Sequence, residues 1–329
     1  REVLDTRPKD EVLRMGAGAM GVSVVIIGRN EARNLSRCIE SVFSALLDQD
    51  NYEMIYVDSN SEDESVSIAL SHGVKVVRIL NADPFCAALG RHIGASLCQN
   101  EYIMFLDGDM ELTEGWIEAG IKNIESSQEF VGAKGILDEY RLDDEDSCVS
   151  FRENVNEVFE YGIARYFGGA ILLKKCDLIQ AGNWSRGVIA NEEAELYSRI
   201  KQKGQKVIQL PIKMATHYQL VEKNDIKHRV RLIFNKRHLG IGQGFVNSLL
   251  TKSHFSFIRH FKFFFFSFLM DILCIILVTG AWFRGTRLFF LAILIQLGLF
   301  TLNVVNRKWY WYILDKITGV YFIPGMLTY

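Results

Sequence analysis

Two aspartates one residue apart, Asp107 and Asp109, directly follow an apolar run at residues 102–106. A buried strand over that run would place both carboxylates at its carboxyl end, where α/β sheets bind their ligands. Gly108 lets the backbone turn so that the two carboxylates can converge. Hard oxygen ligands of this kind suit Mg²⁺ or Mn²⁺ on a phosphate group. Such a turn alone is usually only solvated, so the surrounding segments must decide its meaning.

The elements that would position this turn alternate between strand and helix patterns. Residues 22–27 form a continuous apolar, β-branched run, and residues 34–47 carry apolar side chains at helical spacing. The other expected elements are strands at 53–57, 74–79 and 102–106 and helices at 64–71 and 85–98. This alternation predicts an α/β fold with right-handed crossovers and a mostly parallel sheet. No Gly-x-Gly-x-x-Gly follows the first strand and no Walker lysine loop occurs, which argues against a dinucleotide dehydrogenase and a P-loop enzyme.

Composition limits the class of protein further. The 329 residues suffice for one large α/β domain with an appendage, and a net charge of −2 argues against a general nucleic-acid binder. The six cysteines share no Cys-x-x-Cys spacing, so we interpret them as reduced side chains and not as a zinc or disulfide framework. Residues 1–20 are interpreted as an N-terminal extension or a cloning remnant outside the fold.

The composition shifts to Phe, Leu and Ile from about residue 255. Residues 263–283 contain a single charge, Asp271, and residues 288–305 contain none. Both segments approach the length that crosses a hydrocarbon core of about 30 Å, so we expect a helical hairpin in the membrane. A third hydrophobic segment at 309–329 is expected to be interfacial or partly re-entrant. Asp271 should face another helix, an aqueous pocket or the domain above it.

Lysine and arginine accumulate just before this tail, as expected for a cytoplasmic surface that faces anionic lipid. After the extension, we therefore divide the chain into an α/β domain at 21–225, a basic juxtamembrane segment at 226–258 and a membrane region at 259–329. This division predicts a protein of the inner (cell) membrane with its α/β domain in the cytoplasm.

Six segments in the α/β domain together resemble the successive motifs of family 2 glycosyltransferases with the GT-A fold. The segments are VVIIGRNE (24–31), VDSNSED (57–63), RHIGA (91–95), FLDGD (105–109), FGGAILLK (167–174) and NEEAELYSRI (191–200). The resemblance covers about residues 21–220 and implies a nucleotide-sugar-binding domain. With the hydrophobic tail, it is most similar to the membrane-attached type that acts in bacterial polysaccharide and lipid-linked glycan synthesis.

The resemblance implies a role for five residues on the donor side. Asn30, Glu31 and Asp58 would contact the base and ribose, and Asp58 could accept a hydrogen bond from a uracil N–H. Arg91, together with Asp107, would face the donor diphosphate. The alternatives are a turn residue at the end of a strand for Asp58 and a surface arginine on a helix for Arg91.

The same resemblance implies the metal ligands and the catalytic base. Asp107 and Asp109 would hold Mn²⁺ or Mg²⁺ on the diphosphate, and His217 is either a further ligand or a structural residue. Glu193 stands at the family's position for the base that takes the acceptor proton. Glu192 remains an alternative because this helix carries Glu where the family has Asp. An acidic first helical turn with no catalytic role is the remaining interpretation.

Five residues are candidates for the acceptor side. Trp184 could stack on a sugar ring or fill the core. Arg229, Arg231, Lys236 and Arg237 could form a cationic pocket for an acceptor phosphate.

We therefore expect a metal-dependent, inverting glycosyltransferase that moves one sugar, preferably from a UDP-sugar, to a lipid-linked acceptor at the cytoplasmic membrane face. The missing Gln-x-x-Arg-Trp signature favours a single transfer over processive synthesis. Two alternatives stay open. One is transfer to polyprenyl phosphate, and the other is a catalytically silent membrane scaffold that binds nucleotide.

Overall fold

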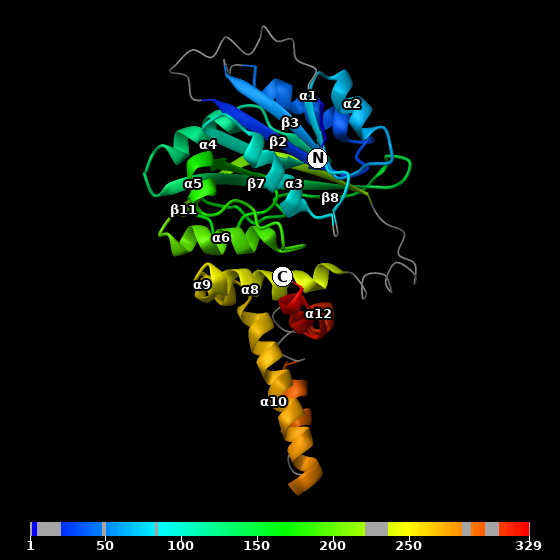
Figure 1. Ribbon diagram of the computed structural model, residues 1–329, viewed down its shortest axis with the longest axis vertical. Coiled ribbons are helices and arrows are strands. Elements are labelled where there is room, and N and C mark those ends of the chain that lie inside the picture. Colours follow the sequence, from blue (N-terminus) through cyan, green and yellow to red (C-terminus); the bar gives the residue numbers. More distant parts are fainter. Residues whose placement is uncertain are drawn as a thin grey trace. The chain divides into compact units, whose positions relative to one another are not determined.

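A computed structural model describes residues 2–4, 21–47, 51–82, 85–220, 236–284, 291–299 and 309–328. The chain forms two compact units, residues 1–229 and 230–329, and each is described by itself (Figure 1). The expected boundary between residues 225 and 226 lies outside the described residues, so the finer division of the chain stays a prediction.

One mixed sheet organises the first unit, with strand order β1-β4-β3-β2-β5-β10-β7-β11-β6, while β8 pairs with β7 and β9 with β11. The strands are β1 Glu2–Leu4, β2 Val22–Gly28, β3 Tyr52–Asp58, β4 Lys75–Arg78, β5 Tyr102–Asp107, β6 Met110–Leu112, β7 Phe130–Leu142, β8 Cys148–Arg152, β9 Gly162–Ile163, β10 Ile171–Lys174 and β11 Lys206–Leu220. The helices are α1 Leu35–Ala45, α2 Ser65–Ser71, α3 Ala87–Leu97, α4 Trp116–Ile124, α5 Lys175–Gln180 and α6 Glu192–Gln202.

The parallel sheet expected from the sequence is present in one half of the observed sheet. Strands β4, β3, β2 and β5 are parallel neighbours, joined by helices α1, α2 and α3. The other half departs from the expectation of a mostly parallel sheet, because β10 runs antiparallel to both β5 and β7, and β6 runs antiparallel to β11. Apolar runs do not encode strand direction, and these strands are not joined by the crossover helices that reveal it.

Each face of the sheet has its own core. Val24 and Ile26 of β2 pack with α1 and α4 on one face, whereas Val25 and Ile27 pack with α3 and α6 on the other. Alternating side chains of a fully buried strand produce this division. Helix α3 approaches β2 closely, since a Cβ atom added at Gly94 would lie 2.3 Å from Cγ1 of Val25. This close approach holds the α3 side chains near the carboxyl end of β5.

The second unit is helical and rich in phenylalanine. Its elements are η2 Lys236–Leu239, α8 Gly240–Leu250, α9 His254–His260, α10 Lys262–Arg284, a helical segment at residues 291–299 and α12 Trp309–Leu327. Helices α8 and α12 meet backbone to backbone, because a Cβ atom at Gly242 would lie 2.2 Å from the carbonyl oxygen of Phe322. Phe257 and Phe264 are buried beside this crossing.

Within the described residues, only α10 contains a stretch that is long and apolar enough to cross a membrane, Lys262–Thr279. Only 17% of that stretch is buried inside the unit, unlike the core helix of a soluble domain. The second half of the expected hairpin is helical at 291–299 and then passes outside the described residues. Membrane attachment, and the expected re-entry of the segment at 309–329, stay predictions.

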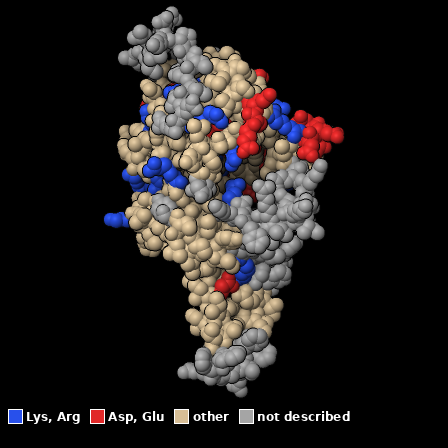
Figure 2. Space-filling view, turned by 45° about the vertical axis from the view of Figure 1, so that its right-hand side comes forward, with Lys and Arg blue, Asp and Glu red and all other residues tan. Residues whose placement is uncertain are grey.

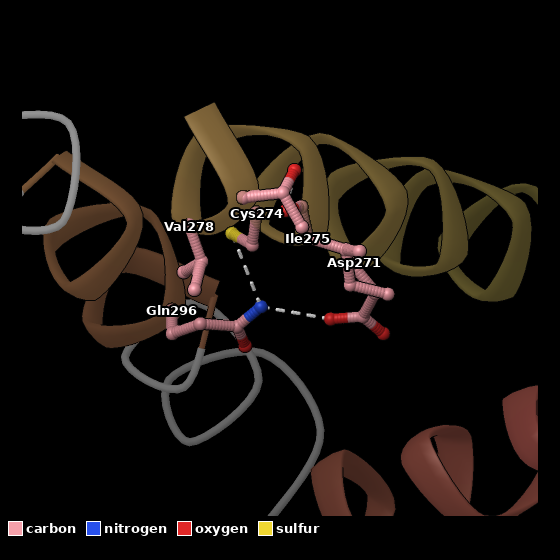
Figure 3. A pocket seen from close by; sticks show the side chains of 6 residues that line it. Asp271, Cys274, Ile275, Val278 and Gln296 are labelled. Atoms are coloured by element: carbon pink, nitrogen blue, oxygen red, sulfur yellow. Dashed lines mark hydrogen bonds between the residues drawn. The ribbon is translucent and has the colours of Figure 1, made fainter. Parts of the chain in front are cut away.

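Asp271 lies on α10 and faces neighbouring helices, as expected for a carboxylate in an apolar segment (Figure 3). Its Oδ1 atom accepts a hydrogen bond of 2.8 Å from Nε2 of Gln296. The same atom forms an ion pair with Nζ of Lys316 on α12. A cavity of about 400 Å³ opens beside it, lined by Asp271, Cys274, Ile275, Val278, Thr279 and Gln296. Figure 2 shows few charged side chains on the visible, described surface of these helices.

Asp271→Ala and Lys316→Ala should each destabilise the second unit, because each change leaves a partly buried charge unpaired. The double variant should therefore lose less stability than the sum of the two single losses. A double-mutant cycle of thermal unfolding in detergent should give a coupling energy of roughly 0.5–3 kcal/mol. Thr279→Ala is the control, because its hydroxyl bonds only to its own helix. Additive effects would show that the ion pair does not join α10 to α12.

Candidate active site

The expected metal side of the site forms where β5, β6 and β11 meet. Asp107 is the last residue of β5, and Asp109 stands in the tight turn before β6. Antiparallel pairing of β6 with β11 places Met110 opposite His217. The Nε2 atom of His217 lies 2.9 Å from Oδ2 of Asp109. Hence the three residues expected to bind metal lie at the carboxyl end of β5.

A third carboxylate, Glu31, packs against the same turn. A Cβ atom at Gly108 would lie 3.1 Å from Cγ of Glu31, so the glycine makes room for that side chain. Burial, followed by the charges of Asp109 and Asp107, raises the pKa of Glu31 to about 8. The sequence interpretation placed Glu31 on the base and ribose, but the structure places it beside the two aspartates. Residue spacing did not reveal this because the loop after β2 folds over the end of β5.

The residues here fit a hard divalent cation, although they do not form a complete cage for one. The Oδ1 atom of Asp109 is buried and has no hydrogen-bond partner in the described part of the chain. Glu31, whose pKa is raised beside this turn, would be a favourable ligand for a cation that replaces its proton. Among the described residues no three ligating side chains already converge at metal-binding distances. Mn²⁺ or Mg²⁺ bound here would need further oxygens, as such ions commonly take from substrate phosphates and water.

Arg91 on α3 connects this side of the site to α6. Its side chain is 2% exposed, and its Nη2 atom lies 2.7 Å from Oδ1 of Asp107. The Nη1 atom lies 2.9 Å from Oε1 of Glu192 and 3.8 Å from Oε1 of Glu193. The structure thus gives Arg91 carboxylate partners within the protein, and its expected contact with the donor diphosphate stays a prediction. Helix α3 directs the side chain inward, where carboxylates already occupy both ends of the guanidinium.

Gly169 makes space for this arrangement. A Cβ atom at Gly169 would lie 2.3 Å from Nη2 of Arg91 and 2.9 Å from Oδ2 of Asp107. The adjacent Gly168 has no atom within 4 Å of an added Cβ. The double glycine before β10 was part of a sequence motif, but only the structure shows that one of the two is required for space.

The two glutamates at the start of α6 differ in exposure. Glu192 has 6% of its side chain exposed and is the direct partner of Arg91, whereas Glu193 has 25% exposed. Burial and the neighbouring Glu192 raise the pKa of Glu193 to about 7, although Arg91 opposes the shift. Of the two sequence candidates for a base, Glu193 is the one that a substrate hydroxyl could reach. Glu192 instead holds the guanidinium in place.

The loop after β3 is ordered by its own hydrogen bonds. Asp58 has no exposed side-chain area, accepts from the backbone N–H of Ser61 at 3.1 Å, and pairs with Arg78 at 3.4 Å. The structure thus corrects the expected base contact of Asp58 to the alternative role, a turn residue at the end of a strand. Asn30 is exposed in a left-handed conformation with φ of 60°, and its Oδ1 atom accepts from the N–H of Glu62 at 2.9 Å. Asn30 is therefore still open to a ligand.

The match to known proteins agrees with this architecture. Residues 23–156 match the family model described as Glycosyl transferase family 2. The chain carries a glycosyltransferase family 2 domain. Glycosyltransferase AglE of Haloferax volcanii is 32% identical over 106 residues, which are 31% of this chain and 35% of that protein. The matched part thus spans about a third of that relative's length.

Two solved structures share the fold of the family 2 domain at low sequence identity. Mannosyltransferase PcManGT from Pyrobaculum calidifontis, in complex with GDP-Man and Mn²⁺, has a TM-score of 0.59 at 13% identity and covers 93% of this chain and 86% of that one. GalNAc-T7 with UDP, GalNAc and Mn²⁺ has a TM-score of 0.53 at 17% identity, covering 73% of this chain and 55% of that one. These similarities confirm the GT-A fold expected from the sequence.

The acceptor side of the family 2 domain is less fully described. Trp184 is completely buried, with its ring 5.4 Å from that of Phe105 and 5.1 Å from the guanidinium carbon of Arg91. It fills the core under the site and cannot stack on a sugar, which corrects its assignment to the acceptor. The expected basic pocket stays a prediction. Arg229, Arg231 and the side chain of Lys236 lie outside the described residues, and Arg237 belongs to the separate second unit.

Gly169→Ala should lower the thermal stability of the family 2 domain, because the added methyl group displaces the buried guanidinium from Asp107. Gly168→Ala is the matched control and should leave the melting temperature unchanged. In an Arg91→Lys background the methyl group no longer meets Nη2, so Gly169→Ala should cost less there. Thermal melts of these variants measure the difference. Equal losses in both backgrounds would show that Gly169 acts independently of Arg91.

Proposed function

We propose that this protein is a metal-dependent, inverting glycosyltransferase that moves one sugar from a nucleotide diphosphate donor to a lipid-linked acceptor. The observation that carries the proposal is the placement of two chemical groups at the ends of one buried arginine. Asp107, with Asp109 and His217 beside it, lies at one end of Arg91. The partly exposed Glu193 lies at the other. Packing alone does not require so many carboxylates in one place.

Support for the donor comes from the metal side of the site and from the structural relatives. One related structure is a complex with GDP-Man and Mn²⁺, and another is a complex with UDP, GalNAc and Mn²⁺. A bound divalent cation would neutralise the negative charge that develops on the departing nucleotide. The preference for uracil rested on Asp58, whose oxygens bond to Ser61 and Arg78 in this structure. We therefore propose a nucleoside diphosphate sugar and leave the base to experiment.

The chemical step requires a proton acceptor close to the acceptor hydroxyl. As that hydroxyl oxygen bonds to the anomeric carbon and the bond from this carbon to the diphosphate breaks, Glu193 takes the hydroxyl proton. A pKa of about 7 suits this role, because the carboxylate is available near neutral pH and still binds a proton well. Attack on the side opposite to the departing diphosphate inverts the anomeric centre. Arg91 and Glu192 keep the carboxylate in position.

The lipid-linked acceptor and the cytoplasmic membrane face are proposed from the second unit. Helix α10 has the length and composition of a membrane span. An enzyme with a water-soluble acceptor would not need a membrane anchor beside its catalytic domain. Transfer to a lipid-linked substrate, compared with a water-soluble one, tests the acceptor directly.

A screen of nucleotide-sugars by thermal shift tests donor and metal together. A true donor should raise the melting temperature only with Mn²⁺ or Mg²⁺. At a donor concentration of one hundred times Kd, the free energy of unfolding should increase by about 2.7 kcal/mol. Asp109→Ala should abolish the metal-dependent part and keep the fold, whereas Glu114→Ala, an exposed residue on the next loop, should behave as wild type. UDP- and GDP-sugars are compared directly. A donor-dependent shift that survives excess EDTA would refute the metal assignment.

Glu193→Gln should keep donor affinity and lower kcat by roughly two to four orders of magnitude, because shape is retained and proton acceptance is lost. Since Glu193 must be deprotonated to act, wild-type kcat/KM should rise with pH through about 7. Glu192→Gln should mainly reduce stability, because it removes the charge that faces Arg91. An inactive Glu192→Gln beside an active Glu193→Gln would make Glu192 the base.

A further inference from the structure

Lys134 on β7 is a buried cation without a partner. The residue is 3% exposed, and its ammonium lies 4.2 Å from the centre of the Tyr166 ring. Within the described part of the chain, this ammonium makes neither a hydrogen bond nor an ion pair. Burial lowers the pKa of Lys134 to about 8, although the more distant charge of Glu157 opposes the shift.

An unpaired buried ammonium is unfavourable in a folded protein. Removing it from water costs free energy that only hydrogen bonds or an opposite charge can offset, and an aromatic face offsets only part of it. An anion that arrives with a ligand would supply the missing partner.

Strand geometry places Lys134 on the same face of the sheet as the candidate base. Gly135, the next residue, approaches Trp116 on the α4 face, so Lys134 points toward the face covered by α3 and α6. β10 lies between β7 and β5 and pairs with both. The segment before β10 carries Tyr166 over Lys134 and, three residues later, Gly169 against Arg91. One short connection therefore contacts both buried cations.

The loop beside Lys134 is held in a fixed conformation. The side chain of Asn156 donates to the carbonyl of Gly135 at 2.6 Å and accepts from the N–H of Leu137 at 3.0 Å. Tyr166 donates its hydroxyl proton to the carbonyl of Asn156 at 3.0 Å. Asn154 and Glu157 both have positive φ, 48° and 54°. Such strained residues persist where the surroundings fix them, and they cluster at binding sites.

We propose that Lys134 binds the phosphate or diphosphate that links the acceptor glycan to its lipid, in a subsite under Tyr166 on the sheet face that also carries α6. The proposal rests on the function proposed above. A lysine ammonium is a compact point charge that suits phosphate oxygens. Tyr166 is 38% exposed and Tyr161 is 56% exposed, so aromatic surface for a sugar or lipid lies next to the charge. The phosphate would give Lys134 the counter-ion that the protein itself lacks.

The test uses the full chain in detergent and measures thermal shifts with four probes. These are a polyprenyl phosphate, the matching polyprenol without phosphate, inorganic phosphate, and UDP or GDP with Mn²⁺. Wild type should be stabilised more by polyprenyl phosphate than by polyprenol. Lys134→Met should lose that difference and keep the nucleotide shift, and Lys134→Arg should recover part of it. Lys213→Met, on the adjacent strand β11 with its charge paired to Asp138, should keep the difference between polyprenyl phosphate and polyprenol, whatever its own melting temperature.

A second readout separates binding from a structural role. Without ligand, Lys134→Met should melt at a higher temperature than wild type, since it removes an unpaired buried charge at nearly constant volume. A lower melting temperature together with an unchanged phosphate-dependent shift would make Lys134 a structural residue and overturn the proposal. Loss of the nucleotide shift would assign it to the donor, and an equal shift from inorganic phosphate would remove the acceptor assignment. If no nucleotide stabilises wild type, the proposed function fails, whereas the phosphate comparison at Lys134 remains interpretable.

Discussion

The buried guanidinium of Arg91 is the constraint on which the site depends. Arginine stays charged in a protein interior, so once α3 carries it under the sheet edge, carboxylates must surround it. Asp107 comes from the end of β5 and Glu192 from the start of α6, two elements far apart in the sequence. Gly169 leaves the space that the guanidinium needs, and Trp184 lies beneath it. The relative positions of the aspartate pair and Glu193 thus follow from one buried residue.

The carboxylates are more numerous than this arginine can neutralise. Glu31 and Asp109 lie beside Asp107, which already pairs with Arg91. In the described part of the chain, the only basic side chain bonded to either Glu31 or Asp109 is His217, which bonds to Asp109. Burial and the hydrogen bond to Asp109 act in opposite directions on His217, and its pKa is raised in sum. Burial, and then repulsion from the neighbouring carboxylates, raises the pKa of Glu31. The same repulsion would favour a divalent cation, which explains why acidic residues can accumulate at a strand end without a structural reason of their own.

The sequence predicted the parts of the fold that depend on local pattern. The parallel strands β2 to β5 and the helices between them followed from apolar periodicity, and the aspartate turn followed from its place after a buried run. Strand direction in β10 and β6 was not predictable in this way, because no crossover helix reveals it. The inward direction of Arg91 was also missed, and for Asp58 and Trp184 the sequence left a structural and a binding role open. Residue type does not show whether a side chain on a helix or at a strand end points inward, since that depends on how closely elements pack, as at Gly94 and Gly169.

Two buried cations on one face of the sheet show how a site can be prepared for a ligand. Arg91 has protein carboxylates at both ends, so its charge is paired before any substrate binds. Lys134 has only an aromatic ring and carries an energetic cost in the free protein. A protein that needed only stability would replace such a lysine with an apolar residue of similar size. The difference between the two cations assigns them different tasks. Arg91 fixes the geometry of groups that belong to the protein, whereas Lys134 leaves an unmet charge that a phosphate-bearing substrate can satisfy.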